Sequence, residues 1–559
     1  MTSTDVLIVG AGPSGLTLAN VLAEHRVGFI IVDKKSGPVR ESRAAVVHVR
    51  TLELLDKLGL AGTAVERGVK IGRVELFERG RRVAEFPLAG KGVEGLTPFP
   101  YALGLEQYQT EELLLEGLRA RGGEARWGTE VLTLRDGDGG TTAIVRGPGG
   151  AEKEISARWI VGADGASSPV RHYLGLKFEG GTYEQTGLLA DVEMDAPAEA
   201  RLGPGKIRLN LTRGGFVGIL NLTGGLYRLF GAVPPHLAQR DKSGRISHEA
   251  YASVALEEIQ RWFDEYFFVN ARLERAQWTS LFRIHSRMAE RFRVGNVFLA
   301  GDAAHIHSPA GGQGMNLGIG DAFNLGWKLA LVSKGQARET LLDSYEAERV
   351  PVAKTVLRNS DRGFVLEATD NPVVQWARAN LATRLVGPLT RLPAVRSLAF
   401  RLFSLTWIGY HGSLVVAGPA AERKGPRPGD RAPYGILEAV SDGRAGLYDL
   451  LKGTGHHLLL FEGLEPNPAL DAYRLAVDEV LGRYAVDVSV HVIPAKERRL
   501  HEIYGAKDKA RLFLVRPDGH VAFVGSLGDL DDLATQMNAL FRGRVAHEGH
   551  PKRSIDLMG

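Results

Sequence analysis

The order of apolar and polar positions at the start of the chain predicts a strand, a helix and a second strand. Residues 5–9 and 29–32 are short apolar runs, which is typical of strands buried in a parallel sheet. Residues 16–24 place apolar side chains at helical spacing. Because the two strands are joined through a helix, this segment predicts a β-α-β unit with parallel strands.

The same periodicities organise the middle of the chain. Residues 159–162 and 296–300 are further buried apolar runs, and a long helix is predicted over 316–333. Residues 180–235 alternate apolar and polar positions, as residues 71–88 do, which indicates an antiparallel sheet with a partly exposed face. The pattern therefore predicts a parallel α/β core together with a second, antiparallel sheet.

The last quarter of the chain has its own alternation of strands and helices. Residues 335–410 are predicted to be mostly helical, and residues 413–433, rich in Gly, Pro and Ala, mark a domain boundary. Beyond that boundary we expect a separate domain. Its strands are predicted near 457–461, 486–493, 511–516 and 520–524, and its helices near 446–452, 471–483 and 529–541.

The composition of the chain excludes several classes of function but says little about the fold. The 69 basic and 65 acidic residues nearly cancel, which argues against a nucleic acid or a membrane as a partner. The chain has no cysteine, so disulfides, thiolate nucleophiles, cysteine-ligated zinc and iron–sulfur clusters are excluded. No run of about 18 apolar residues occurs and the N-terminus has no basic segment. We therefore expect a cytoplasmic protein without a membrane span or a signal peptide.

The turn between the first strand and the first helix carries the glycine pattern of a dinucleotide site. In GAGPSG at 10–15, Gly10 permits a tight turn, Gly12 lets a pyrophosphate approach the backbone, and Gly15 lets the helix pack on the strand. The N-terminus of the helix then offers N–H groups to phosphate. Asp33 lies 18 residues after Gly15, where an acid binds the adenosine ribose. Since Asp33 would repel a 2′-phosphate, this pocket predicts FAD or NAD rather than NADP.

A second glycine-rich loop precedes the long helix. Gly301 and Asp302 follow a predicted strand, at the edge where α/β sheets bind ligands. Residues 311–314 then hold three glycines, and such a loop presents backbone N–H groups that stabilise an anion such as the edge of a reduced flavin. His305 and His307 lack an evident third ligand, so we predict no metal site and expect them to order the loop by hydrogen bonds.

Three motifs stand in order along the chain: GAGPSG at 10–15, ADG at 163–165, and GD at 301–302, the last followed by HSPAGGQGMNLGIGDAFNLGWKLA at 307–330. Together they strongly resemble the class A flavoprotein aromatic monooxygenases, of which para-hydroxybenzoate hydroxylase and phenol hydroxylase are familiar members. The resemblance covers about residues 1–360.

The C-terminal part is similar to that of the phenol hydroxylases and the aromatic polyketide hydroxylases. The stretch PGDRAP at 428–433, the strand at 458–461 and the RPDG hairpin at 516–519 carry this similarity. It implies a thioredoxin-like domain, which performs no dithiol chemistry because it has no cysteine. We expect a structural or dimer-packing role for it.

The resemblance implies an α/β fold with a Rossmann-like FAD-binding domain, an inserted antiparallel-sheet substrate domain, a helical segment and the C-terminal thioredoxin-like domain. We expect a monomer or a homodimer. The expected boundaries are 1–178 for the first part of the FAD-binding domain, with 71–104 joining the substrate sheet, 179–285 for the substrate-binding sheet domain, 286–412 for the second part of the FAD-binding domain and the helical segment, and 413–559 for the linker and the C-terminal domain.

By the same resemblance, one set of residues would hold FAD along its length. Asp164 would serve both FAD and the nicotinamide cofactor, and with no second dinucleotide fold in the sequence NADPH or NADH is expected to bind transiently. The implied FAD contacts are Gly10, Gly12, Pro13, Ser14 and Gly15 for the pyrophosphate, Asp33, followed by Lys34, for the adenosine ribose, Arg43 for the phosphates, Gln107 and Asp302 for the ribityl chain, Val131 for the adenine, and Gly314, Met315 and Asn316 for the isoalloxazine edge.

The resemblance also implies the reaction steps. NAD(P)H reduces FAD, the reduced flavin reacts with O₂ to a C4a-hydroperoxide, and an electron-rich aromatic carbon attacks the distal oxygen. Where phenol hydroxylase has an Asp and a Tyr that activate the phenol, this chain has Ala45 and Phe282. His48 and His285 are the candidate replacement bases, with buried structural histidines as the alternative reading, and Pro309 is a candidate catalytic residue.

We predict hydroxylation of a phenolic or polycyclic aromatic substrate of polyketide type, as in antibiotic biosynthesis. Phe216, Phe230, Trp278 and Phe282 either line the substrate pocket or belong to the core of the sheet. Baeyer–Villiger oxygenation of a polyketide ketone and a non-catalytic dinucleotide-fold binding protein are the alternatives. A flavin halogenase is disfavoured because its W-x-W-x-I-P motif does not occur.

Overall fold

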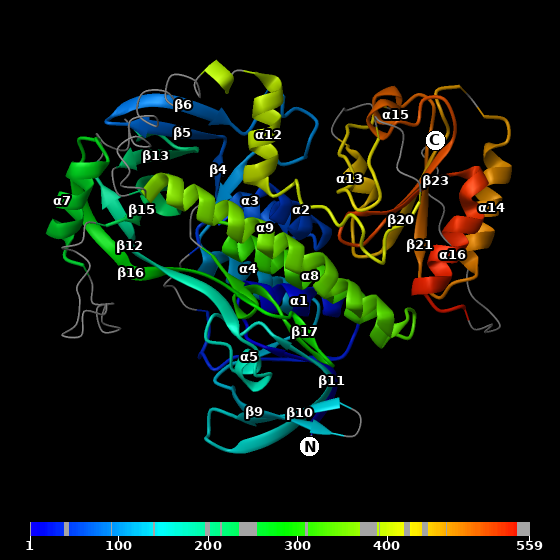
Figure 1. Ribbon diagram of the computed structural model, residues 1–559, viewed down its shortest axis with the longest axis horizontal. Helices are drawn as coiled ribbons and strands as arrows, with labels where there is room; N and C mark the ends of the chain where they lie inside the picture. Colours follow the sequence, from blue (N-terminus) through cyan, green and yellow to red (C-terminus); the bar gives the residue numbers. More distant parts are fainter. Residues whose placement is uncertain are drawn as a thin grey trace.

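The structure of the protein is a computed structural model. Two eight-stranded sheets and a four-stranded sheet are arranged around the long helix α8 (Gly314–Ser333), as Figure 1 shows. The residues that the structure describes are 2–38, 44–90, 92–137, 140–195, 202–212, 215–233, 254–307, 311–368, 388–390, 392–418, 425–438, 445–465 and 467–544.

The first eight-stranded sheet is built on the predicted β-α-β unit. β1 (Thr2–Val9) pairs in parallel with β2 (Phe29–Val32) on one side and with β11 (Glu152–Gly162) on the other. The parallel order continues to β18 (Val297–Leu299) beyond β11 and to β8 (Ala125–Arg126) beyond β2. Strands buried on both faces need apolar side chains at consecutive positions, which explains the continuous apolar runs in the sequence.

Antiparallel strands flank this parallel core. β9 (Glu130–Gly137) and β10 (Gly140–Arg146) form a hairpin, and β10 pairs with β11. At the edge of the sheet, β17 (Arg293–Val294) pairs with β18. The hairpin projects at the bottom of Figure 1.

Helices α1 (Pro13–Glu24), α4 (Gln107–Ala120) and α8 cover the sheet, with α1 packed against both of the others. Nearly all residues of α8 from Asn316 to Val332 are buried, as expected for a helix that is surrounded by protein on every side. The shorter helices near this sheet are α2 (Val49–Lys57), α3 (Ala61–Arg67) and α5 (Pro169–Tyr173).

The second eight-stranded sheet stands beside the first. Its neighbouring strands are antiparallel, except that β13 and β5 run in parallel. In order across the sheet, the strands are β19 (His305–Ile306), β16 (Leu273–Ala289), β12 (Phe178–Met194), β15 (Tyr227–Ala232), β14 (Gly215–Asn221), β13 (Lys206–Thr212), β5 (Arg73–Glu78) and β6 (Arg81–Pro87).

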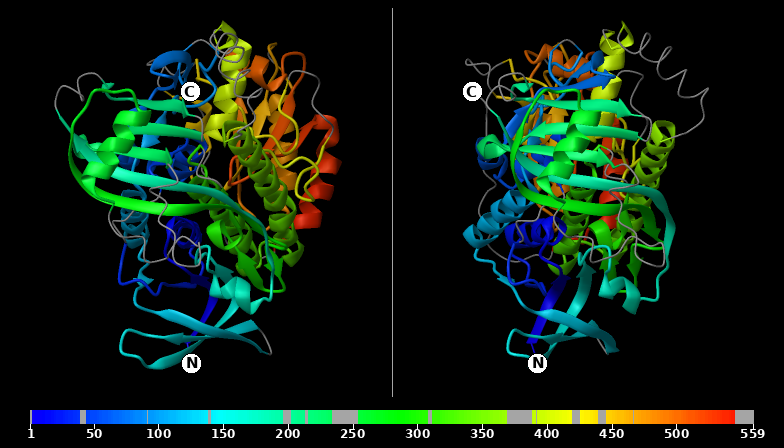
Figure 2. Two further views of the ribbon diagram at one scale, coloured as in Figure 1. Left: turned by 60° about the vertical axis from the view of Figure 1, so that its left-hand side comes forward. Right: turned by 90° about the vertical axis from the view of Figure 1, so that its left-hand side faces the viewer.

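The two faces of this second sheet have different surroundings. Helix α7 (Leu256–Tyr266) packs Trp262 and Phe263 against Leu188 and Leu229 on the outer face, and Figure 2 shows the helix lying over these strands. Side chains alternate between the faces along each strand, so the residues next to Leu188 and Leu229 point to the inner face. The inner face looks toward the first sheet.

A small three-stranded sheet links the two large ones, with β7 (Ala102–Gly104) between β3 (Val46–Val47) and β4 (Val69–Ile71). After α8, the chain continues through α9 (Asp343–Ala368) and α12 (Pro393–Ser404). These segments connect the first part of the molecule to the C-terminal part.

The C-terminal part has a four-stranded sheet in the order β21-β20-β22-β23. β20 and β21 are parallel, while β20–β22 and β22–β23 are antiparallel. Its elements are α13 (Leu447–Leu450), β20 (His456–Phe461), α14 (Leu470–Gly482), β21 (Val488–Ile493), α15 (Arg498–Tyr504), β22 (Arg511–Val515), β23 (Val521–Ser526) and α16 (Leu530–Leu540).

The C-terminal sheet shares a hydrophobic core with the first sheet. Leu458 and Leu512 of the C-terminal sheet belong to the same buried cluster as Trp327 of α8 and Ile8 of β1. The predicted α/β class is confirmed. Among the described residues, no helix is both long and apolar enough to cross a membrane.

Candidate cofactor and substrate site

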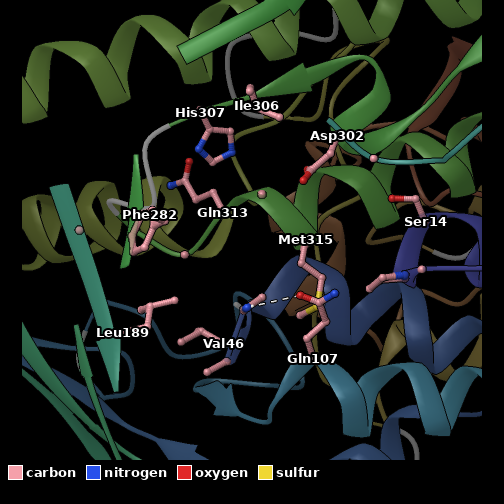
Figure 3. A pocket seen from close by; sticks show the side chains of 18 of the residues that line it. Ser14, Val46, Gln107, Leu189, Phe282, Asp302, Ile306, His307, Gln313 and Met315 are labelled. Atoms are coloured by element: carbon pink, nitrogen blue, oxygen red, sulfur yellow. Dashed lines mark hydrogen bonds between the residues drawn. The ribbon is translucent and has the colours of Figure 1, made fainter. Parts of the chain in front are cut away.

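A cavity of about 680 Å³ lies between the two large sheets. The glycine turn after β1 and the ends of β2 and β11 form one side of it, and the inner face of the second sheet forms the other. Residues at the end of β19 and at the start of α8 lie between the two sides, and Figure 3 shows the side chains of Ile306, His307, Gln313 and Met315 around the cavity. One continuous space therefore joins the predicted dinucleotide site to the predicted substrate sheet.

The glycine turn has the shape that close approach of a ligand requires. Gly10 adopts a φ of +103°, and a Cβ there would lie 2.3 Å from the carbonyl oxygen of Ala163. A Cβ on Gly15 would lie 1.9 Å from the carbonyl oxygen of Gly10, so Gly15 serves the packing of α1 on the turn and does not line the cavity. Nothing lies within 4 Å of a Cβ on Gly12, which lines the cavity together with Pro13 and Ser14.

Asp33 is fixed at the end of β2 by two backbone groups. The N–H of Ala11 donates to Oδ2 at 2.7 Å, and the N–H of Lys35 donates to Oδ1 at 2.8 Å. The carboxylate thus ties the glycine turn to the second strand and lines the cavity beside Lys34. This position suits a ribose hydroxyl, because a carboxylate accepts up to four hydrogen bonds.

Asp321 of α8 organises the Gly301–Ala303 turn from behind. It is fully buried, and its Oδ2 accepts the N–H of Gly301 at 3.0 Å and contacts His305 Nε2 at 2.7 Å. Its Oδ1 accepts Nε of Arg349 at 2.6 Å. Burial alone would raise the pKa of Asp321, but Arg349 and His305 outweigh it and lower that pKa to about 2. The predicted hydrogen-bonding role of His305 is therefore present, and Asp302 next to it lines the cavity.

These residues fit FAD, the cofactor that the sequence resemblance implies. The open backbone at Gly12 stands at the N-terminus of α1, where phosphates bind. Asp164 lines the cavity, its Oδ2 accepts the N–H of Val170 at 3.1 Å, and its buried Oδ1 has no partner among the described residues. Burial raises the pKa of Asp164. A ligand that donates a hydrogen bond to Oδ1 would satisfy that atom. Gln107 and Val131 also line the cavity.

Asn316 has a different position from the one expected. Its side chain does not line the cavity, because Nδ2 donates to the carbonyl oxygens of Val46 and Gly312, each at 2.9 Å. It therefore fixes the loop, while Gly314 and Met315 before it line the cavity. Arg43 and Pro309 lie outside the described residues.

The substrate side of the cavity is largely apolar and aromatic. Phe216, Phe230 and Phe282 line it, and the rings of Phe216 and Phe230 meet edge to face at 6.1 Å. Trp278 does not line the cavity; it lies 5.4 Å from the guanidinium of Arg228. Three of the four predicted aromatic residues are thus brought together.

The structure corrects the two candidate bases. His48 does not line the cavity. It is fully buried, its backbone N–H donates to Asn316 Oδ1 at 2.8 Å, and its ring Nε2 lies 2.9 Å from the carbonyl oxygen of Gly311. Burial lowers its pKa to about 4, so it is neutral near pH 7. His285 contacts Thr182 at 2.8 Å and lies on the face of β16 opposite to Phe282. His48 is thus a buried histidine, as the alternative reading held, whereas His285 is only half-buried and lies away from the cavity.

The cavity lining includes polar residues that sequence reasoning missed, among them Arg228 and Gln313. Arg228 is 2% exposed and donates Nε and Nη2 to the two oxygens of Asp191, both at 2.7 Å. An arginine at the inward position of an otherwise apolar strand is the signal that could have found it. His307 was expected only to order the loop by hydrogen bonds, yet it is the only histidine among the described residues lining the cavity. In the described part of the chain, no group of three metal-ligating side chains gathers.

Comparison with known families covers most of the chain. Residues 3–360 match the family model described as FAD binding domain, and residues 425–543 match the model described as aromatic-ring hydroxylase, C-terminal. The first match alone spans more than half of the chain.

Individual relatives align over nearly the full length. The chain is 36% identical to a rifampicin monooxygenase of Streptomyces venezuelae, with 97% of this chain and 99% of the relative covered. It is 32% identical to a pentachlorophenol 4-monooxygenase of Sphingobium chlorophenolicum, with 95% of each chain covered. The solved structure of OxyS, an anhydrotetracycline hydroxylase from Streptomyces rimosus, is 29% identical, with a TM-score of 0.70 and coverage of 97% of this chain and 99% of that one.

Proposed function

Because this chain belongs to the FAD-dependent aromatic-ring monooxygenases, we propose that it hydroxylates a phenolic, multi-ring aromatic compound of polyketide type, with NADPH or NADH as the reductant and O₂ as the oxidant. The observation that carries the proposal is the single cavity that joins the glycine turn to an aromatic-lined sheet. Membership of this family makes the protein an enzyme, in place of the non-catalytic alternative.

The residues that would hold FAD follow the cavity from one sheet to the other. Gly12 and the N-terminus of α1 would receive the pyrophosphate, and Asp33 the ribose. Gln107 and Asp302 would contact the ribityl chain, and Gly314 and Met315 the ring system. When bound, FAD supplies the redox chemistry of the reaction, accepting a hydride and activating O₂.

The protein's own contribution is to position the substrate and to exclude water. Phe282, Phe230 and Leu189 present apolar surface to the cavity beside the loop that carries Gln313. Apolar walls keep water away from reactive species and strengthen the electrostatic interactions inside the site. A flat aromatic compound would bind between this surface and the loop.

His307 is the proposed acceptor of the phenolic proton. Its ring lines the cavity near Phe282 and Gln313, as Figure 3 shows. A neutral imidazole accepts a proton near pH 7, and a deprotonated phenol is the more electron-rich nucleophile. His307 takes the role that the sequence had given to His48 or His285, neither of which reaches the cavity.

The test is a substrate panel with the purified holoenzyme. NADPH and NADH oxidation would be followed with phenol, hydroxynaphthoquinones and hydroxyanthraquinones, and products identified by mass spectrometry and NMR. We expect one hydroxylated multi-ring product and an oxidation rate that rises with that substrate. A ring-expanded lactone would identify Baeyer–Villiger oxygenation instead. Oxidation that no aromatic compound stimulates would refute the proposal.

A further inference from the structure

The floor of the cavity contains two phenylalanine–glycine pairs on neighbouring strands. On the inner face of the second sheet, Phe282 of β16 is paired with Gly187 of β12, and Phe230 of β15 is paired with Gly218 of β14. All four residues line the cavity or lie directly beneath it, and both phenylalanines are half-buried. Each pair joins a large ring to a position without a side chain.

Each ring lies over the backbone of its glycine. A Cβ on Gly187 would meet Cζ of Phe282 at 2.4 Å, and a Cβ on Gly218 would meet Cζ of Phe230 at 2.2 Å. Distances under 3.0 Å are not found for real Cβ atoms, so an alanine at either position would force the ring to move. Because the sheet backbone lies below the ring, the ring can yield only toward the cavity.

Backbone conformation does not require glycine at these positions. Gly187 and Gly218 both lack the positive φ that other residues avoid, unlike Gly231 on the same sheet, whose φ is +146°. Alanine would also be no worse than glycine in a strand by backbone propensity. Glycine at these two positions therefore leaves room above the strand for the phenylalanine ring.

The two rings together cover a wide part of the inner face. The Phe282 ring covers β12 and the Phe230 ring covers β14, with β15 between them, so two strand spacings of about 10 Å in total separate the covered strands. Leu189 and Leu209 lie beside the rings on the same face. An apolar surface of this width matches a fused-ring system better than a single aromatic ring, since stacking on aromatic side chains needs extended contact.

We infer that Gly187 and Gly218 determine substrate specificity. Because they let the rings of Phe282 and Phe230 lie close over the strands, the cavity accepts planar fused-ring aromatics and favours them over single-ring phenols. The inference rests on the proposed function and restricts its substrate class to planar fused-ring aromatics. Displacing either ring into the cavity would obstruct a large planar ligand, while a single ring would still fit elsewhere in the cavity.

The experiment measures binding and turnover separately in the holoenzyme. Isothermal titration calorimetry with 1,8-dihydroxyanthraquinone and with phenol gives the two affinities for the wild type, G187A and G218A. We expect each variant to lose roughly tenfold or more in affinity for the anthraquinone, the scale by which small steric changes in an apolar pocket discriminate ligands. Affinity for phenol should stay within about twofold of the wild type.

Two further variants separate specificity from folding. G181A makes the same change on β12 at a glycine whose Cβ would meet nothing within 4 Å, and it should leave both affinities unchanged. In the double variant G187A with Phe282→Leu, the smaller side chain makes room for the new methyl group, and anthraquinone affinity should return toward the wild-type value.

Specific results would overturn the inference. It fails if G187A and G218A bind the anthraquinone as the wild type does, if phenol affinity falls equally, or if G181A shows the same loss. The proposed function has its own failure: a wild-type enzyme that binds the anthraquinone tightly but oxygenates no aromatic compound would refute that function and leave the specificity result standing.

Discussion

At the scale of single residues, two carboxylates hold the backbone of the cofactor site in place. Asp33 accepts the N–H groups of Ala11 and Lys35, and Asp321 accepts the N–H of Gly301. Asp33 joins its strand to a turn 22 residues away, and Asp321 joins α8 to a turn 20 residues away. The site is thus held in shape before a ligand binds, which lowers the ordering cost of binding.

Replacing Asp33 by alanine should weaken FAD binding by roughly tenfold to a hundredfold, because two N–H groups lose a charged acceptor and the ribose loses its partner. Titration of the apoprotein with FAD, followed by quenching of flavin fluorescence, measures this change. Ser36→Ala, at an exposed position of the same turn that does not line the cavity, is the control for a general effect on the turn. Equal affinity of D33A and the wild type would contradict the assignment.

Replacing His307 by asparagine should lower kcat/KM by roughly a hundredfold near pH 7, since asparagine cannot accept the phenolic proton. The loss should shrink as the pH approaches the pKa of the substrate phenol, where the substrate ionises without help. A pH profile of kcat/KM measures both effects. The control is His285→Gln. Because His285 lies on the face of β16 that points away from the cavity, this variant should have the pH profile of the wild type. A pH-independent loss in H307N would indicate a packing role.

At the scale of elements, the glycine turn couples α1 to β1 and β11. Gly10 lies against Ala163 at the end of β11, and Gly15 of α1 lies against the carbonyl of Gly10. The three segments meet with no room for a methyl group. This close packing places the helix N-terminus over the ends of the parallel strands, where the phosphates would bind.

The variant Gly15→Ala should therefore lose FAD and stability together. The new Cβ would lie 1.9 Å from a carbonyl oxygen, and moving α1 away costs roughly 1–3 kcal/mol. The flavin content of the purified protein and its thermal midpoint measure the outcome. Gly62→Ala in α3, where a Cβ meets nothing within 4 Å, is the matched control and should be neutral or stabilising. Full flavin content in G15A would contradict the packing argument.

At the scale of the whole molecule, a buried ionic cluster joins the C-terminal sheet to α8 and α9. Arg516 donates to both oxygens of Glu348, at 2.6 and 2.9 Å, and Lys328 donates to the same carboxylate at 2.8 Å. Burial would raise the pKa of Glu348, but Arg516 and Lys328 hold it well below its ordinary value. Asn324 connects Glu348 to Asp518 on the hairpin between β22 and β23.

Replacing Arg516 by methionine should destabilise the protein by about 3–5 kcal/mol, because it leaves buried carboxylates without their main counter-charge. Urea unfolding followed by circular dichroism measures the change. Arg483→Met, which breaks an exposed ion pair with Glu479 on the same domain, is the control and should leave the transition unmoved. A small effect of R516M would show that the cluster does not hold the two parts together.

Acid should destabilise the junction between these two parts. His456 of β20 packs edge-on against Trp327 and Phe541, at 5.4 and 5.3 Å, and burial together with Arg516 lowers its pKa to about 3. Above pH 6.5 its contribution is fully present, since the imidazole is neutral in both states. As the pH falls from 6.5 toward 3, only the unfolded state takes up the proton, and stability falls by about 1.4 kcal/mol per pH unit.

The variant His456→Phe removes this titration and should flatten the acid side of the stability profile. Thermal midpoints between pH 7 and pH 4 for the wild type and H456F measure the difference. Equal slopes for the two proteins would show that His456 does not take up a proton on unfolding.

The sequence predicted those features that depend on local patterns of residues. The β-α-β unit, α8 and the C-terminal strands follow from periodicity, because each is buried along a regular stripe or run. Helix α7 was not predicted, although its apolar residues pack on the outer face of the second sheet. The glycine turn and Asp33 were also accessible, because their roles depend on spacing within one β-α-β unit.

The sequence could not predict which histidine lines the cavity, because this depends on which face of a strand packs against which loop. His48, His285 and His307 look alike in the sequence, yet only His307 lines the cavity. The orientation of each is set by strand register and by partners such as Asn316 and Thr182, which come from distant segments.

The sequence by itself determined the fold class and the cofactor, since both follow from short-range patterns that every copy of the fold must satisfy. Tertiary structure alone decided which histidine lines the cavity, the position of Arg228 and the placement of the Phe282 and Phe230 rings over Gly187 and Gly218, because these arise where strands far apart in the chain are brought into register. It also decided how Arg516 meets Glu348, a contact between the C-terminal domain and α9.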